Sequence, residues 1–178
     1  MQQLIEGLLN YHRAQESVGR LELTAVRFDR VVEQVLDDHR LAVQARGIRA
    51  DLRLDPVILH ADEEKLRAIA ANLVSNAIKY SPDEGMISLA LRREGDEVVF
   101  DVRDAGPGIP PEDRDRIFDW FYQGEDAHRG RLRGSGLGLA IAREFVVAHG
   151  GRIEVVKALA AGAHFRVTLA AGTPRPEP

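Results

Sequence analysis

The sequence predicts an α+β fold, a two-layer sandwich in which three helices cover one face of a mixed, mostly antiparallel sheet. Two observations support this prediction. Segments with helical apolar periodicity and segments that alternate like strands do not follow a strict strand–helix–strand order. Two pairs of alternating segments are adjacent in the chain, as in hairpins. The length of 178 residues is sufficient for one domain with a sizeable core and an appendage.

The first third of the chain is expected to hold two helices and three strands. Residues 2–17 carry one apolar stripe at helical spacing, which needs a partner to bury it. A second helix is expected over residues 29–46, and Gly47 ends it. The strands of this region are expected over residues 20–26, 48–54 and 57–61.

The rest of the chain is expected to hold a long helix, two hairpins and two further helices. Asp62 is a favourable N-cap for a helix over residues 63–81, which Pro82 terminates. Gly95 and Asp96 form the turn of the first hairpin. The hairpin strands are expected over residues 86–94 and 97–104 and over residues 151–156 and 163–170, and the further helices over residues 110–121 and 137–149.

Composition and charge exclude several classes of protein. The chain has no cysteine, which excludes disulfides, thiolate metal sites and a cysteine nucleophile. Its net charge of −4, with both signs mixed along the chain, disfavours nucleic acid as a partner. No apolar run approaches the roughly 18 residues that span a bilayer, and the N-terminus lacks the pattern of a signal peptide.

Three polar residues share one face of the long helix. Asn72, Asn76 and Lys79 are spaced at i, i+4 and i+7, beside the apolar stripe of that helix. Two amides and a lysine are therefore expected at the rim of the core, where a ligand can reach them. The alternative is an ordinary solvated face, although asparagine is unfavourable inside a helix.

An aspartate follows the inward-facing residues of the strand expected over residues 97–104. Asp104 has the same parity as Phe100 and Val102, which predicts that it points to the apolar face. A buried carboxylate is costly unless it is paired. The residues after it, AGPGIP, contain glycines that allow a close approach to the backbone. The alternative is that Asp104 caps its own turn.

The stretch RGSGLGLAIA places three glycines in front of the helix expected over residues 137–149. Glycines at such a position allow an anion to approach the unpaired N–H groups and positive end of the helix. The two best-known glycine patterns do not fit, because Leu139 replaces the third glycine of G-x-G-x-x-G and the chain has no Gly-Lys pair. The alternative is a flexible loop that precedes a helix.

Four motifs in order resemble those of sensor histidine kinases. NLVSNAIKYS resembles the N box of that family, DAGPGIP the G1 box, IFDWFYQG the F box and GSGLGLAIA the G2 box. The resemblance covers nearly all of residues 21–170. It implies the Bergerat-type ATP-binding sandwich that gyrase, heat-shock chaperones and MutL share, with ATP and Mg²⁺ as ligands.

The resemblance also implies a domain organisation. The helix over residues 2–17 resembles the end of the second helix of a dimerisation hairpin. Residues 1–19 are therefore expected to be that helix end and a linker, residues 20–170 the ATP-binding catalytic domain, and residues 171–178 a disordered tail.

Roles for individual residues follow from the resemblance. It implies that Asp104 accepts a hydrogen bond from the adenine amine, that Asn76 places its oxygen on Mg²⁺, and that Lys79 contacts phosphate. The remaining nucleotide-binding positions that it implies are Tyr80, Gly106, Gly108, Gly134, Gly136, Leu137 and Gly138. These residues come from three of the four motifs.

Two more positions are candidates for a role in phosphoryl transfer. Arg129 lies in residues 122–133, which resemble the ATP lid of the family and are expected to move, and is a candidate for the γ-phosphate. Asn72 matches the position where the clamp ATPases carry a glutamate that activates water, and an amide cannot take a proton. Gln123 departs from the arginine often found after FY in the family.

The implied function is a protein-histidine kinase that transfers the γ-phosphoryl group of ATP to a histidine on the dimerisation hairpin. In the family an acidic residue follows that histidine, and none of the six histidines here has such a neighbour. The hairpin is therefore expected to be largely missing, and the chain is not expected to phosphorylate itself. The expected partners are the hairpin of a homodimeric full-length kinase and a response regulator. The domain is expected in the cytoplasm, with membrane contact only through missing upstream segments.

Two other functions remain as alternatives. A clamp-type ATPase is disfavoured because Asn72 cannot act as a base. A nucleotide-binding pseudokinase that serves as an interaction module is disfavoured by the presence of Asn76, Asp104 and GSGLGL. Measurement of ATP binding with and without Mg²⁺ discriminates among these functions.

Overall fold

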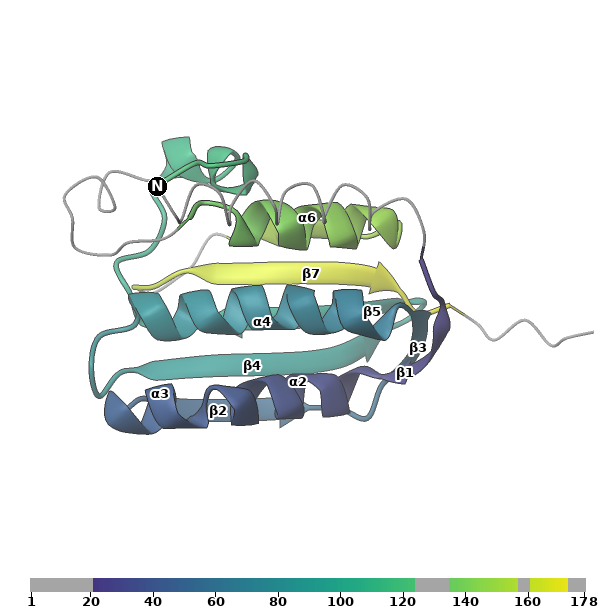
Figure 1. Cartoon of the computed structure of the whole chain (residues 1–178), viewed down its shortest axis with the longest axis horizontal. Coiled ribbons are helices and arrows are strands. Elements are labelled where there is room, and N and C mark those ends of the chain that lie inside the picture. Colours follow the sequence, from purple (N-terminus) through teal and green to yellow (C-terminus); the bar gives the residue numbers. More distant parts are fainter. Residues whose placement is uncertain (1–20, 124–134, 157–160, 173–178) are drawn as a thin grey trace, which may run out of the picture.

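The described part of the chain forms two layers, a sheet and a layer of helices that covers one of its faces (Figure 1). The structure is a computed structural model, and it describes residues 21–123, 135–156 and 161–172. The helix expected over residues 2–17 lies outside these ranges. In chain order the elements are β1 (Thr24–Arg27), α2 (Phe28–Asp38), α3 (Arg40–Ala45), β2 (Arg49–Leu54), β3 (Ile58–Ala61), α4 (Glu63–Tyr80), β4 (Met86–Glu94), β5 (Glu97–Arg103), η1 (Pro111–Asp113), η2 (Arg116–Phe118), α6 (Gly138–Ala148), β6 (Arg152–Val155) and β7 (His164–Ala170).

The main sheet is mixed, as the sequence predicts. Among the described residues its strand order is β2-β4-β5-β7-β6, with β2 parallel to β4 and all other neighbours antiparallel. β1 and β3 pair separately as a two-stranded antiparallel ribbon, which the sequence did not indicate. Figure 1 shows α2, α4 and α6 side by side across one face of the main sheet. The predicted α+β sandwich is confirmed.

The core lies between the helices and the sheet. On β5 the residues Val98, Phe100 and Val102, which share one face of the strand, are buried, and so are Val99 and Asp101 on the other face. The rings of Phe28 and Phe100 meet edge to face, with centroids 5.4 Å apart. The helices add the fully buried side chains Val32, Val35, Leu66, Ile69, Leu73 and Val74. Burial of this apolar surface holds α4 on the sheet.

The single helix expected over residues 29–46 is divided at His39, where α2 ends and α3 begins. The imidazole Nδ1 of His39 donates to the carbonyl oxygen of Val35 at 2.8 Å. The main-chain N–H of His39 donates to the oxygen of Leu36 instead, at 3.1 Å. The side chain thus binds the carbonyl oxygen that a helical N–H would use, at the residue where the helix is interrupted.

The single helix expected over residues 110–121 is also incorrect, because this segment forms the two short 3₁₀ turns η1 and η2. After η2 the main chain is extended at Asp119, with φ −76° and ψ 146°. Phe121 then adopts a φ of 63°, and both conformations end helical structure. Phe118 is buried and packs its ring on Phe165, with centroids 6.3 Å apart.

The N-cap predicted for the long helix is confirmed. Asp62 Oδ1 accepts a hydrogen bond from the main-chain N–H of Lys65 at 3.1 Å. Its Oδ2 accepts from the Lys65 ammonium at 2.6 Å and from the N–H of Glu22 at 3.1 Å. The N–H of Asp62 donates to Nε2 of His149, 3.1 Å away. This cluster joins the start of α4, the end of α6 and the segment before β1.

Candidate functional site

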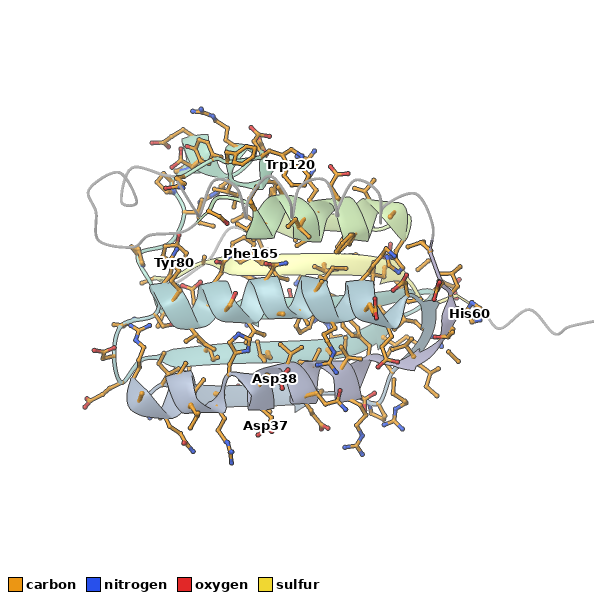
Figure 2. The ribbon with its side chains drawn as sticks, in the orientation of Figure 1. Asp37, Asp38, His60, Tyr80, Trp120 and Phe165 are labelled. Carbon is orange, nitrogen blue, oxygen red and sulfur yellow. The ribbon has the colours of Figure 1, made fainter. Side chains whose placement is uncertain are left out.

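Four segments that are distant in the sequence meet toward one end of the sandwich. They are the C-terminal half of α4, the loop after β5, the segment before β7 and the start of α6. Because β5 and β7 are antiparallel, the residues that follow β5 meet those that precede β7. Figure 2 shows Tyr80 at this end of α4. All the predicted site residues that lie in the described ranges belong to α4, to the loop after β5 or to the start of α6.

Asp104 uses one of its two carboxylate oxygens within the fold. Oδ1 accepts hydrogen bonds from the main-chain N–H groups of Gly106 at 2.8 Å and Ala163 at 3.0 Å. Oδ2 forms no hydrogen bond with any described residue. Burial raises the pKa of the Asp104 carboxyl above its ordinary value of 3.8, and the two N–H donors offset part of this effect. The residue therefore caps its own turn with one oxygen and leaves the other available to a donor.

The glycines around Asp104 allow main-chain segments to pack directly on one another. A Cβ atom on Gly106 would lie 2.6 Å from the carbonyl oxygen of Tyr80, at the end of α4. Gly108 has a φ of +82° and faces the carbonyl oxygen of Gly162, which a Cβ atom would approach to 3.1 Å. The glycines predicted as binding residues therefore also join the loop after β5 to its neighbours.

The three polar residues of α4 are half-buried, which contradicts the alternative of a solvated face. Asn72 Nδ2 donates to the carbonyl oxygen of Ala68 at 2.9 Å. A Cβ atom on Gly138 would lie 2.6 Å from Asn72 Oδ1, so Asn72 packs against the first residue of α6. Lys79 Nζ lies 4.8 Å from the ring centroid of Tyr80 and 3.4 Å from its hydroxyl oxygen. Asn76 forms no hydrogen bond within the described ranges.

The start of α6 is held against the segment that follows η2. The N–H of Phe121 donates to the carbonyl oxygen of Gly136 at 3.0 Å, and Gly136 has a φ of +69°. Leu137 is the N-cap of α6, buries its side chain in the fold and forms no side-chain cap. The first N–H groups of α6 are therefore not capped by that side chain. Arg129 and Gly134 lie outside the described residues.

Three residues that hold the site together were not predicted from the sequence. Gly162 supports the loop after β5, as described above. Ser81 Oγ accepts a hydrogen bond from the N–H of Ala105 at 3.3 Å, which links the end of α4 to the same loop. Arg46 donates to carbonyl oxygens at the end of α4. A glycine before the last strand was a visible signal for the first of these, whereas a serine and an arginine in loops carry no comparable signal.

A comparison with protein families identifies the chain. Residues 61–173 match the family described as histidine kinase-, DNA gyrase B-, and HSP90-like ATPases. The chain belongs to this family. Asp104 and the glycines of the loop after β5 lie inside the matched range, as do all of α4 and all of α6.

Relatives within this ATPase family are sensor histidine kinases. The chain is 36% identical over 169 residues to sensor histidine kinase GlrK of Escherichia coli strain K12, an alignment that covers 95% of this chain and 35% of that protein. It is 35% identical over 170 residues to sensor-like histidine kinase SenX3 of Mycobacterium tuberculosis strain H37Rv, with 94% and 41% covered. The chain therefore spans little more than a third of the length of these curated relatives.

Solved histidine kinase structures share the fold of this family member. The nucleotide-free catalytic domain of histidine kinase ThkA aligns with a TM-score of 0.76 at 25% identity, over 84% of this chain and 96% of that chain. Full-length ShkA in complex with AMPPNP aligns with a TM-score of 0.79 at 30% identity, over 97% of this chain and 36% of that chain. The predicted resemblance to a histidine kinase ATP-binding catalytic domain is confirmed. Within its described residues, this domain has no helix with the length and apolar character of a membrane span.

Proposed function

We propose that the chain binds Mg-ATP and supplies the catalytic half of a sensor histidine kinase. Residues 20–170 form the ATP-binding domain in this proposal, and residues 1–19 connect it to a dimerisation hairpin that carries the phosphoacceptor histidine. The single observation that carries the proposal is the state of Asp104. It is a half-buried carboxylate with one oxygen engaged by two N–H groups and one oxygen that has no partner among the described residues.

Asp104 is the proposed adenine-binding residue. A carboxylate only accepts hydrogen bonds, and the adenine amine is a donor that would satisfy the second oxygen. Burial already raises the pKa of Asp104, so its ionised form lacks full compensation in the nucleotide-free fold. Gly106 and Gly108 let this loop pack directly on the carbonyl oxygens of Tyr80 and Gly162, which fixes the position of Asp104. The proposal assigns them to the nucleotide site on the resemblance.

Lys79 and Tyr80 are the proposed contacts for phosphate and for the base or ribose. They lie together at the end of α4, next to the loop that holds Asp104. The proposal also assigns phosphate to the first N–H groups of α6, with Gly136, Leu137 and Gly138 as the residues that present them. Arg129 and Gly134 belong to the same proposal on the resemblance alone, because they lie outside the described residues.

Asn76 is the proposed protein ligand for Mg²⁺. In the described ranges no three His, Asp or Glu side chains gather to hold a metal ion. Asn76 fits, because its amide is half-buried and has no other partner there, and Mg²⁺ binds few protein oxygens together with waters and phosphates. When it is bound with ATP, Mg²⁺ neutralises charge on the phosphates. A neutral amide binds the ion weakly alone, so we expect the metal to arrive with the nucleotide.

The proposed reaction is phosphoryl transfer to a histidine nitrogen. The new bond joins that nitrogen to the γ-phosphorus, the bond from the γ-phosphorus to the bridging oxygen breaks, and ADP leaves. Such a reaction depends on positioning and charge neutralisation more than on covalent chemistry by the protein. The proposed partners are the dimerisation hairpin of a homodimer and a response regulator that receives the phosphoryl group.

Labelled ATP tests this function. The chain should bind ATP in the presence of Mg²⁺ but not label itself, because no histidine in it has the expected acidic neighbour. Addition of the intact dimerisation hairpin should produce an acid-labile, alkali-stable phosphohistidine on the hairpin. Nucleotide binding without any transfer to the hairpin would favour the pseudokinase alternative. Steady release of inorganic phosphate without transfer would favour a clamp-type ATPase.

A further inference from the structure

We propose that Arg46 is a positioning residue for nucleotide binding, which it supports from behind the end of α4; this inference rests on the proposed function. Arg46 follows α3 as its C-cap residue and lies 35 positions before Ser81 in the sequence. Among the residues assigned to the nucleotide, the Arg46 side chain contacts only Lys79, at its main-chain carbonyl group. Its effect on binding is therefore indirect.

The guanidinium of Arg46 bridges the last turn of α4. It donates to the carbonyl oxygen of Ile78, to that of Ser81 at 2.7 Å and more weakly to that of Lys79 at 3.4 Å. Its Nε donates to the carboxylate of Asp83 at 2.8 Å. The last carbonyl groups of a helix have no partners within the helix and form its negative end. A planar cation with several donors fits this position.

The main chain around Arg46 holds the same region from a second direction. The carbonyl oxygen of Arg46 accepts a hydrogen bond from the N–H of Glu84 at 2.8 Å. The N–H of Arg49, at the start of β2, donates to the carbonyl oxygen of Gly85 at 2.9 Å. The segment that leaves α4 is thus fixed to the turn between α3 and β2. The position of the end of α4 depends on this turn as well as on the apolar core.

The end of α4 in turn positions the loop that carries Asp104. Ser81 Oγ accepts from the N–H of Ala105 at 3.3 Å, and Gly106 packs on the carbonyl oxygen of Tyr80. Arg46 therefore reaches the proposed adenine site in two steps, first to Ser81 and then to the residue after Asp104. A shift of the last helical turn would move the free oxygen of Asp104 relative to Lys79 and Tyr80.

Arg67 is a matched control for Arg46. It is also an arginine that ties α4 to another helix, since its guanidinium donates to Asp38 at 3.3 Å and to Gln34. The exposed fractions of the two side chains are similar, 32% for Arg46 and 39% for Arg67. Arg67 lies in the first half of α4 and touches neither the end of the helix nor the loop after β5. Substitution of Arg67 therefore measures the effect of losing an arginine that anchors α4 at a place remote from the proposed site.

The test compares Arg46→Ala and Arg67→Ala in ADP affinity by calorimetry and in hydrogen exchange. We expect Arg46→Ala to weaken ADP binding about tenfold and Arg67→Ala to change it less than about twofold. We also expect faster exchange of the Ala105 and Gly106 amides in nucleotide-free Arg46→Ala, but not in Arg67→Ala. Arg46→Lys keeps the charge without the planar fork and should recover part of the affinity.

The possible failures are distinguishable. If the wild-type chain does not bind ADP, both the proposed function and the proposed role of Arg46 are wrong. If the wild-type chain binds ADP and both alanine variants bind it equally well, only the role of Arg46 is wrong. An equal loss in both variants that follows their thermal stability would assign Arg46 to general stability and overturn the proposal. If Arg46→Ala does not fold, Arg46→Lys decides: affinity equal to that of wild type would overturn the proposal, and an intermediate loss with faster Ala105 exchange would support it.

Discussion

Gly162 lies so close to Asp104 that a Cβ atom on the glycine would be 1.9 Å from the main-chain carbonyl oxygen of the aspartate. The next residue, Ala163, forms two hydrogen bonds with Asp104. Its carbonyl oxygen accepts from the N–H of Asp104, and its own N–H donates to Oδ1 of Asp104. The segment before β7 therefore packs directly on the residue proposed to bind adenine. No side chain larger than that of glycine fits there without movement of the loop.

We predict that Gly162→Ala lowers both stability and nucleotide affinity. The new Cβ atom must push the Asp104 loop away, and the φ of +108° is itself unfavourable for alanine. A loss of about 3 kcal/mol in the free energy of unfolding is expected from this strain and overpacking. Gly150→Ala is the control, because Gly150 has a φ of +69° but nothing within 4 Å of its Cβ position. It should cost only about 1 kcal/mol in a denaturant titration. Equal losses in the two variants would contradict the steric argument.

We predict that Asp104→Asn separates binding from stability. The variant places an NH₂ group where the adenine amine would donate, so ADP and ATP affinity should both fall about 10- to 150-fold. Its carbonyl oxygen can still accept from Gly106 and Ala163, so the fold should persist. Calorimetry with ADP measures the first effect, and unchanged ADP affinity would disprove the assignment to adenine.

The effect of Asp104→Asn on the free energy of unfolding can be predicted from the pKa of Asp104 in the wild-type protein. Because burial raises the pKa of Asp104 in the folded state, the folded protein holds this proton more strongly than the unfolded chain does. The contribution of Asp104 to stability is therefore greatest at low pH and is lost as the pH rises from about 3.8 through the folded pKa. At neutral pH the asparagine variant should melt no lower than wild type without nucleotide. A large drop in melting temperature would show that the ionised carboxylate is needed for folding.

We predict that Asn76→Ala reduces the benefit of Mg²⁺ for ATP binding. Its amide has no partner among the described residues, so its removal should cost little stability. ATP affinity should fall in the presence of Mg²⁺ and change much less in EDTA, because only the metal-bound nucleotide uses this oxygen. Asn72→Ala is the comparison, since Asn72 packs against Gly138 and should affect both conditions alike. An equal loss with Mg²⁺ and with EDTA for Asn76→Ala would make Asn76 a structural residue.

A buried ion cluster lies on the sheet face opposite to α2, α4 and α6 (Figure 1). Asp101 is 2% exposed and accepts hydrogen bonds from His164 Nε2 at 2.6 Å, from Arg166 Nε at 2.9 Å and from Arg92. Burial opposes ionisation of Asp101, but these hydrogen bonds outweigh burial and hold its pKa well below the ordinary value of 3.8. The cluster crosses β4, β5 and β7 and ties the middle of the sheet together.

We predict that Asp101→Asn destabilises the protein by about 3 kcal/mol at neutral pH, because the substitution removes the buried negative charge that the half-buried guanidinium groups of Arg92 and Arg166 share. The folded pKa is lowered, so the stability that Asp101 contributes is present above about pH 4 and is lost as the pH falls toward the folded pKa. Wild type should therefore lose more stability than the variant on acidification below pH 4. Glu97→Gln, which breaks the exposed pair with Arg152, is the control and should cost less than about 1 kcal/mol. Parallel pH profiles for wild type and Asp101→Asn would refute the prediction.

Much of the fold was predictable because its signals are local. The cap at Asp62 and the stop before Pro82 bound α4, as the sequence predicts, and the parity of Asp104 with Phe100 and Val102 predicted an inward position for this residue, which is half-buried. The two helices that were predicted incorrectly are interrupted by local conformation. One expected helix is divided at His39, whose side chain binds the carbonyl oxygen of Val35, and helical structure in the other ends before Asp119, where the main chain is extended. Neither effect changes apolar periodicity, so the pattern alone does not reveal it.

The sequence by itself determined most of the elements, the mixed character of the sheet and the positions that carry the four motifs, because periodicity, capping and motif order depend on residues close together in the chain. Only the tertiary structure decided which oxygen of Asp104 remains free, since Ala163, a donor to the other oxygen, lies 59 positions away. It likewise decided that Arg46 binds the end of α4 and that Gly162 must be a glycine. Such contacts depend on distances between distant segments, and those distances exist only after the layers have packed.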